Sequence, residues 1–113
     1  MPDDDFFSKA DRSAIRNIAL EEVQELSEQV PGLLERITND PQDGEARKDL
    51  ERVFHTVCGS AALAGFKDLS RIGRITEDLI HKIPDEIPLT GDQMQTIRKA
   101  AQELLTLVAG YIN

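Results

Sequence analysis

Apolar residues recur at intervals of three and four over most of the chain, which is the spacing of one face of an α-helix. Pro31 falls within the first such stripe, although a proline costs about 3 kcal/mol in a helix interior. Because the stripe keeps its phase across Pro31, it predicts one long helix over about 12–38 with a kink at the proline. The apolar residues from Phe6 to Ile18 fit either an earlier turn of this helix or a separate short helix. The stripe consists of Ala19, Val23, Leu26, Val30, Leu33 and Ile37.

Three further stripes predict helices over about 45–64, 67–83 and 91–112. No segment of useful length alternates between apolar and polar residues, as a half-buried strand would. The apolar faces of these helices must therefore be buried against one another. The three stripes consist of Ala46, Leu50, Val53, Phe54, Val57, Ala61 and Ala64; of Leu69, Ile72, Ile75, Leu79, Ile80 and Ile83; and of Met94, Ile97, Ala101, Leu104, Val108 and Tyr111.

Short turn segments separate the predicted helices. Residues 39–44 are rich in turn formers, and Pro84 begins the connection to the last helix. At the start of that helix, Thr90 and Gln93 have the spacing of a capping box. Amphipathic helices joined by short turns favour antiparallel neighbours. We therefore predict an all-α fold, an antiparallel up-and-down four-helix bundle that forms a single domain over residues 1–113.

The composition fits a small domain that folds on its own, and it narrows the choice of partners. The 113 residues include 13 basic and 21 acidic side chains, which give a net charge of −8 and a pI near 4.7. We expect neither nucleic acid nor a membrane as a partner, because both require concentrated positive charge or a long apolar run. The single cysteine cannot form an internal disulfide, and the N-terminus lacks a signal-peptide pattern. We expect a cytoplasmic domain that is itself a monomer.

The clearest candidate for chemistry is His55, in the second predicted helix. At about 100° per residue it lies about 140° from Leu50, which marks the centre of the apolar stripe, and it therefore faces solvent. One turn later comes Gly59, although a glycine costs about 1 kcal/mol relative to alanine in a helix interior. Ala62 continues this face with little bulk. The pattern indicates that another molecule approaches His55 closely.

The third predicted helix offers a carboxylate partner for this histidine. Gly73 is a second glycine in mid-helix, and Glu77 lies one turn after it at the border of the apolar stripe. If the second and third helices pair, Glu77 can accept a hydrogen bond from one ring nitrogen of His55. That bond would fix the tautomer and leave the other nitrogen unprotonated, outward and nucleophilic.

The segment from Phe54 to Phe66 resembles the histidine phosphotransfer (HPt) domain, whose signature is a histidine, a lysine three residues later, and then glycine and small residues. The resemblance continues through Asp68 to Ile80 and is closest to the N-terminal phosphotransfer domain of chemotaxis-type histidine kinases (CheA). The acidic first helix, from Ala19 to Ile37, is also similar to the first helix of that family.

This resemblance implies a function in two-component signalling. His55 would accept a phosphoryl group from an ATP-binding kinase domain and pass it to an aspartate of a response-regulator receiver domain. Gly59 would provide clearance, and Glu77 would orient the imidazole. The partner domains would supply ATP and Mg²⁺. We expect no cofactor and no ATP-dependent activity in the chain itself, which has no glycine-rich phosphate loop. If the chain is part of a larger protein, the parent is expected to be a histidine protein kinase.

Cys58 occupies the position where the family has a lysine. That lysine would lie beside the phosphoryl group and balance its charge, which a neutral thiol cannot do. Three alternatives follow: neighbouring cations substitute, transfer is slowed, or the domain is a docking module that carries no phosphate. The cations that could substitute are Lys48, Arg52, Lys67 and Arg74, the last at a position where many chemotaxis-type domains have a second histidine.

Charge and small side chains predict where partners bind. Over residues 44–83, seven basic and six acidic residues give a net charge of +1, whereas the rest of the chain carries −9. A locally non-acidic surface suits both a phosphorylated histidine and the acidic pocket of a receiver domain. The predicted partner-binding residues are Lys48, Arg52, Cys58, Ala62, Leu63, Lys67 and Arg74.

Other candidate residues favour simpler interpretations. Cys58 lies at the edge of its stripe, which is typical of a small, half-buried apolar residue. His81 borders the polar face of its helix, where a histidine is most often only solvated. A glutamate precedes a histidine by four residues twice, at Glu51 and His55 and at Glu77 and His81. Di-iron sites in bundles instead use Glu-x-x-His pairs that point into the core, so we predict no metal site.

Overall fold

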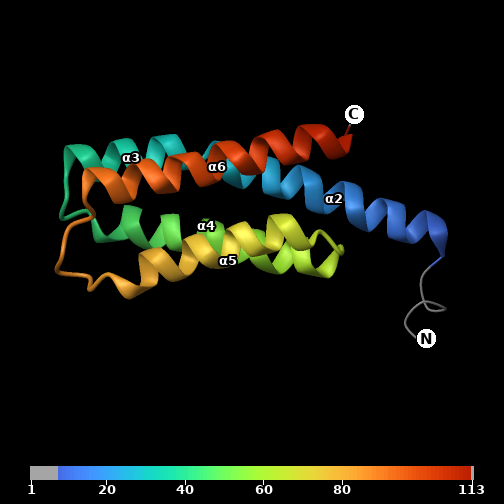
Figure 1. Ribbon diagram of the computed structural model, residues 1–113, viewed down its shortest axis with the longest axis horizontal. Coiled ribbons are helices and arrows are strands. Elements are labelled where there is room, and N and C mark those ends of the chain that lie inside the picture. The colour runs from blue at the N-terminus through green and yellow to red at the C-terminus, as the bar shows by residue number, and fades with distance from the viewer. Residues whose placement is uncertain (1–7, 113) are drawn as a thin grey trace.

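The computed structural model describes residues 8–112, which form helices and the turns between them (Figure 1). Phe6 and Phe7 lie outside the described residues. α2 and α3 follow one another as a single bent rod, and successive rods run antiparallel. The predicted all-α four-helix bundle is therefore confirmed. The helices are α2 (Lys9–Glu28), α3 (Val30–Asn39), α4 (Gly44–Leu63), α5 (Lys67–Lys82) and α6 (Gly91–Ile112).

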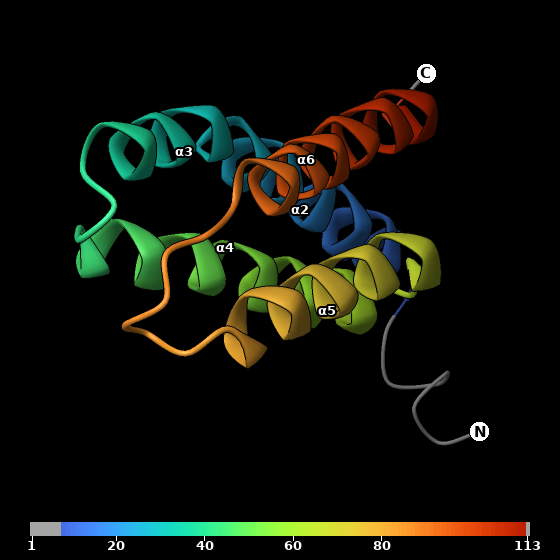
Figure 2. The same ribbon diagram turned by 60° about the vertical axis from the view of Figure 1, so that its left-hand side comes forward.

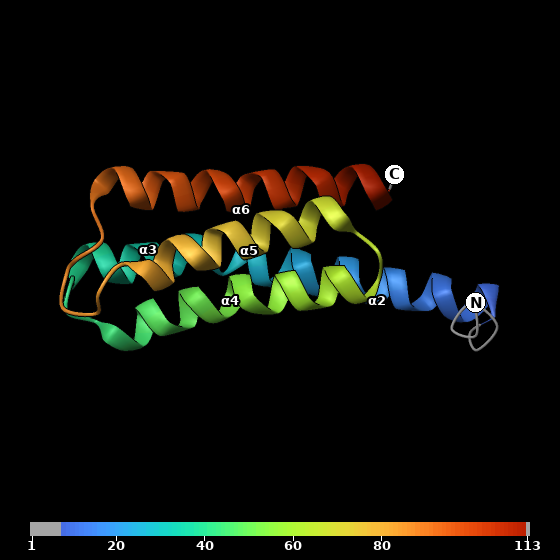
Figure 3. The ribbon, with the colours of Figure 1, turned by 60° about the horizontal axis from the view of Figure 1, so that its bottom comes forward.

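The bundle has two layers. In one layer α4 and α5 lie side by side, and in the other the α2–α3 rod lies beside α6 (Figure 2). α4 packs most extensively against α5, and the N-terminal part of α2 extends past the ends of both (Figure 3). Apolar residues from all the helices fill the core between the layers. Its largest fully buried side chains include Phe54, Leu34, Leu50, Leu69, Ile80, Ile97 and Leu104.

Capping boxes determine where two of the helices begin. The Ser8 hydroxyl accepts from the amide of Asp11, and the Asp11 carboxylate accepts from the amide of Ser8, both at 3.1 Å. This capping box starts α2 at Lys9, three residues before the predicted boundary. The predicted capping box of α6 is confirmed, because the Thr90 amide donates to Gln93 at 2.8 Å and the Gln93 amide to Thr90 at 3.1 Å.

The start of α4 is fixed by Asp43. Its Oδ1 accepts a hydrogen bond of 2.9 Å from the amide of Ala46, and its carboxylate also pairs with Arg36 at 3.1 Å. The bond from Ala46, supported by the guanidinium of Arg36, lowers the pKa of Asp43. The N-terminal end of α4, which carries part of the candidate site, is thus tied to the end of α3.

The predicted single long helix over 12–38 is divided into α2 and α3, with the bend at Gln29. Pro31 has no N–H to donate to the carbonyl of Ser27, four residues earlier, so one helical hydrogen bond is lost. Gln29 keeps helical backbone angles (φ −76°, ψ −21°). The chain therefore bends two residues before the proline and continues in nearly the same direction.

α4 and α5 are joined by a tight turn at Gly65, whose φ of 86° favours glycine. The amide of Phe66 donates to the carbonyl of Ala61 at 2.8 Å, and that of Gly65 to the carbonyl of Ala62 at 3.1 Å. This pair of bonds is a Schellman motif. Because α5 begins directly afterwards, the two helices form an antiparallel hairpin.

The apolar stripe of α5 is displaced from the predicted one. Ile75, a predicted stripe residue, is 54% exposed, whereas Gly73 and Thr76 are buried. On α6, Tyr111 is also partly exposed, and its hydroxyl donates to Asp68 at 2.7 Å. That hydrogen bond raises the pKa of Tyr111. The face of α5 that meets α4 is therefore centred on small residues.

Candidate functional site

α4 and α5 come into backbone contact at Gly73. A Cβ atom at this position would lie 2.8 Å from the amide nitrogen of Cys58 and 2.9 Å from the carbonyl oxygen of Phe54. Both atoms belong to the backbone of α4 and cannot move aside, so only glycine permits this contact. The close approach also lets short side chains reach across, as when the Ser70 hydroxyl donates to the Cys58 carbonyl at 3.0 Å.

One turn after Gly73, Glu77 reaches across to His55 on α4. Nδ1 of His55 lies 2.7 Å from Oε2 of Glu77. An ionised carboxylate can only accept, so Nδ1 carries the hydrogen and Nε2 keeps a free lone pair. The His55 side chain is 72% exposed and that of Glu77 24%. The structure thus brings together the two residues that the sequence paired, with the imidazole open to solvent and the carboxylate sheltered.

This arrangement suits a nucleophile. When Nε2 of His55 forms a bond to an electrophile, positive charge develops on the ring, and the carboxylate of Glu77 at Nδ1 stabilises that charge. The same hydrogen bond restricts the rotation of the ring. A shallow hollow of about 400 Å³ beside the ring leaves room for the electrophile; it is lined by Lys48, Glu51, Arg52, His55 and Glu77.

Gly59 lies one turn after His55 on the exposed side of α4. A Cβ atom there would meet no other atom within 4 Å, so packing within this chain does not require a glycine. Ala62 extends the same surface, and Leu63, which is 84% exposed, lies beside it on the side that faces Ile15 and Ile18 of α2. The proposed role of Gly59, clearance for a partner, remains a prediction.

Two of the predicted partner-binding cations lie beside His55. Lys48 and Arg52 line the hollow next to the ring. Arg52 is also paired with Asp49, one turn earlier on α4, at 3.1 Å. A partner that approaches the hollow would therefore meet these two positive charges on one side of the imidazole.

The other two predicted cations lie on α5. Arg74 is exposed one turn before Glu77. Lys67 is the first residue of α5, which places it about 15 Å along the helix axis from Glu77. Arg74 is thus close to the carboxylate that holds His55, whereas Lys67 lies at the turn that joins α4 to α5.

Cys58 is turned toward α5. It is half-buried, and its Sγ lies 3.5 Å from the hydroxyl oxygen of Ser70. These contacts fit the interpretation of Cys58 as a small, half-buried residue. The thiol brings no charge to the position where the resemblance expects a lysine.

A second histidine–glutamate pair, which the sequence analysis missed, lies near the first. His81 is exposed, but its Nδ1 is 3.3 Å from Oε1 of Glu51 on α4. The signal for this pair was the repeated Glu-x-x-x-His spacing. On sequence alone that spacing suggests only a metal motif, and the position of His81 at the border of the polar face predicts a solvated side chain.

Within residues 8–112, no three His, Cys, Asp or Glu side chains are placed to share a metal ion. None of the helices in the same range has the length and apolar character needed to cross a membrane.

Comparisons with known proteins agree with the geometry. A family model described as the Hpt domain matches residues 14–107. Among solved structures, the CheA phosphotransferase domain from Thermotoga maritima superimposes with a TM-score of 0.82 at 20% sequence identity, over 95% of this chain and 100% of that one. At this identity the likeness shows the shared fold. A search of curated proteins finds no significant match.

Proposed function

This chain belongs to the Hpt domain family, the phosphotransfer modules of two-component signalling, and on that basis we propose that His55 is its phosphoryl acceptor. In this proposal the donor is ATP bound to the kinase domain of a histidine kinase. The recipient is an aspartate of a response-regulator receiver domain. The chain thus serves as a carrier between two partners.

The observation that carries this proposal is the 2.7 Å hydrogen bond between Nδ1 of His55 and Glu77, together with the exposure of the ring. It leaves Nε2 as the only ring nitrogen with a free lone pair. The hollow beside the ring and the open space at Gly59 give a protein-bound phosphoryl group room to approach.

The proposed reaction has two steps. First, Nε2 of His55 attacks the γ-phosphorus of ATP, an N–P bond forms, the bond to the bridging oxygen breaks, and ADP leaves. Glu77 shares the resulting positive charge through the Nδ1 hydrogen. Second, the receiver aspartate attacks the phosphorus, and the N–P bond breaks and returns the electron pair to Nε2. The partners supply ATP, Mg²⁺ and the receiver's own charged groups, so this chain needs no cofactor.

We infer that the partners dock on the exposed faces of α4 and α5. Ala62 and Leu63 provide a low apolar rim, and Lys48, Arg52 and Arg74 provide positive charge around it. This part of the chain is locally non-acidic within an acidic protein, which favours an acidic receiver pocket.

The test is phosphorylation by the ATP-binding domain of a histidine kinase with γ-labelled ATP. We expect the native chain to be labelled and His55→Gln to lose the kinase-dependent label. His81→Gln, the matched control, must still be labelled on His55. Equal labelling of His55→Gln and the native chain would refute the assignment.

The second candidate function is a docking module that binds a receiver or kinase domain without carrying phosphate. The observation that favours it is Cys58, which provides no charge at the lysine position of the family. Two results together would support this alternative. The native chain would bind a receiver domain without being labelled, and the Cys58→Lys variant would be labelled. Labelling of the native chain would exclude it.

A further inference from the structure

The second histidine–glutamate pair repeats the first with the helices exchanged. Glu51 and His55 lie four residues apart on α4, and Glu77 and His81 lie four residues apart on α5. In the antiparallel hairpin, His55 faces Glu77 and Glu51 faces His81. A local twofold relation between α4 and α5 therefore exchanges the two pairs.

The two pairs share the features that make His55 a nucleophile. In each, Nδ1 is the nitrogen that contacts the carboxylate, so Nε2 keeps the lone pair. The side chain of His81 is 76% exposed, close to the 72% of His55. Glu51, like Glu77, is more sheltered than the histidine that it holds.

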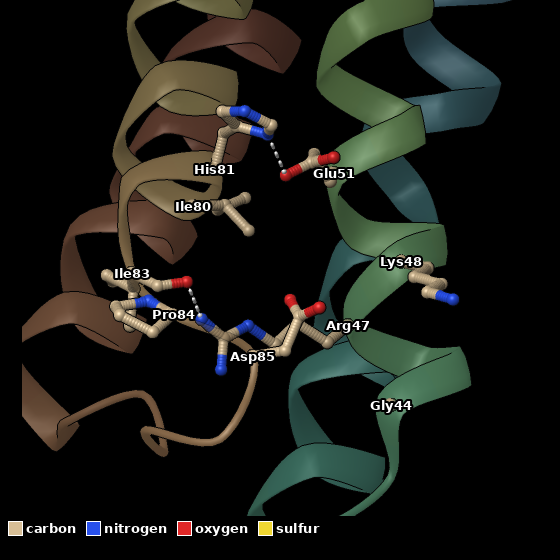
Figure 4. Close-up of a pocket in the computed structure, with 9 residues that line it drawn as sticks. All are labelled: Gly44, Arg47, Lys48, Glu51, Ile80, His81, Ile83, Pro84 and Asp85. Carbon is tan, nitrogen blue, oxygen red and sulfur yellow. Dashed lines mark hydrogen bonds and ion pairs between the residues drawn. The ribbon is translucent and has the colours of Figure 1, made fainter.

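His81 lies at one end of a cavity whose other end carries a positive charge. A cavity of about 580 Å³ lies between the start of α4 and the end of α5 (Figure 4). Arg47 crosses it and donates hydrogen bonds of 2.6 Å to the carbonyls of Ile83 and Ile87, which fix the guanidinium in the cavity wall. Asp85 lines the same cavity and partly offsets this charge. The cavity is large enough to admit a small phosphoryl donor.

We propose that His81 is a second phosphoryl-acceptor site, with Glu51 as its positioning residue. Nε2 of His81 attacks the phosphorus of a donor, an N–P bond forms, and the bond to the leaving group breaks. The leaving group takes the electron pair, and Glu51 shares the ring's positive charge through the Nδ1 hydrogen. This inference rests on the proposed function, because it extends the chemistry of His55 to the second pair.

Two features of the structure predict that His81 accepts a phosphoryl group more slowly than His55. Its hydrogen bond is 3.3 Å long, compared with 2.7 Å for His55, so the carboxylate stabilises the ring charge less. Asp85 follows the end of α5 at Lys82 and lines the same cavity, so its carboxylate opposes the approach of a phosphoryl group from that side. We expect His81 to react about tenfold more slowly than His55.

Phosphoramidate tests this site without a protein partner. It is a small donor that transfers its phosphoryl group to a ring nitrogen and releases ammonia. The chain has two histidines, so His55→Gln leaves His81 as the only acceptor. The rate of phosphorylation of the full-length variant would be followed by mass spectrometry and ³¹P NMR. The same variant unfolded in urea provides the rate of a histidine with no carboxylate partner.

We expect the folded His55→Gln variant to react about tenfold faster than the unfolded one. In the folded double variant His55→Gln/Glu51→Gln, the phosphorylation rate should fall to that of the unfolded protein. Glu45→Gln, which removes an exposed carboxylate from the same helix without touching His81, should leave the rate unchanged. Thermal unfolding of each variant would show that the fold is retained.

Two results would overturn the proposal: equal rates for folded and unfolded His55→Gln, or no effect of Glu51→Gln. Neither bears on the kinase assay at His55, so the two proposals can fail separately. If the kinase leaves His55 unlabelled, the proposed function falls, while a Glu51-dependent reaction with phosphoramidate still supports the second acceptor.

Discussion

The α4–α5 hairpin carries a histidine–glutamate pair at its middle and another at its open end, in different surroundings. In the middle, His55 lies on a low surface beside Gly59, above the backbone contact made by Gly73. At the end, His81 borders a cavity that Arg47 crosses, where α5 gives way to the connection to α6 (Figure 4). The carboxylate partner is present at both places, and the shape of the surface differs.

This difference separates two requirements of a phosphotransfer site. A histidine held by a carboxylate is sufficient for a nucleophile, and the hairpin provides it twice. A folded partner domain additionally needs a surface without bulky side chains, which only the middle of the hairpin provides. We therefore infer that access, more than the chemistry of the ring, directs protein partners to His55.

The largest expected effect is that of removing His55 in the kinase assay. Because Nε2 of His55 is the proposed acceptor, His55→Gln should reduce kinase-dependent labelling at least about a hundredfold. Labelling would be measured with γ-labelled ATP and the site confirmed by mass spectrometry. If His81 were labelled by the kinase in this variant almost as strongly as His55 is in the native chain, access would not distinguish the two sites.

Gly73→Ala should have the next largest effect, on stability. The added methyl group would lie 2.8 Å from the amide nitrogen of Cys58, so α4 and α5 would have to separate. We expect a loss of about 3 kcal/mol in the free energy of unfolding, measured by urea denaturation. The separation should also lengthen the bond between His55 and Glu77, which NMR of the ring protons would detect. Unchanged stability would show that the hairpin tolerates a wider spacing.

The four-helix fold could be predicted because apolar spacing alone reports helices and their buried faces. The start of α6 could also be predicted from Thr90 and Gln93, because a capping box depends only on local sequence. The start of α2 was missed although Ser8 and Asp11 carry a similar signal. Ile75 was placed on the buried face because periodicity does not show that a glycine forms the contact with α4.

The candidate site could be predicted only in part. Both histidine–glutamate pairs depend on one antiparallel register, in which His55 faces Glu77 and His81 faces Glu51. The exposed His55 and the resemblance to the HPt domain pointed to the first pair. The second pair follows from the same register through the repeated Glu-x-x-x-His spacing, and it was missed because that spacing was interpreted only as a metal motif. The role of Gly73 was also missed, because periodicity places a residue on a face of its helix but does not show how closely the neighbouring backbone approaches it.

Glu77→Gln tests how much the carboxylate contributes at the middle of the hairpin. The neutral amide can still accept a hydrogen bond from Nδ1, but it no longer balances the charge that develops on the ring. We expect the phosphorylation rate of His55 to fall about tenfold with either donor, the kinase or phosphoramidate. Glu86→Gln, in the exposed connection before α6, is the control for the loss of one charge. If the phosphorylation rate fell equally in both variants, the change in overall charge would explain the effect.

Gly59→Ala should have the smallest effect and separates access from chemistry most directly. The added methyl group meets no atom of this chain, so the helix should gain up to about 1 kcal/mol of stability. A kinase domain that docks against α4 would meet the methyl group, and its transfer to His55 should slow severalfold, whereas the reaction with phosphoramidate should not change. Gly110→Ala, an exposed helical glycine on α6 that is equally open, should gain stability and retain full transfer. If Gly59→Ala also retained full transfer, open space beside the ring would not be what draws a protein partner to His55, and the contrast with His81 would have to rest on the length of the carboxylate hydrogen bond instead.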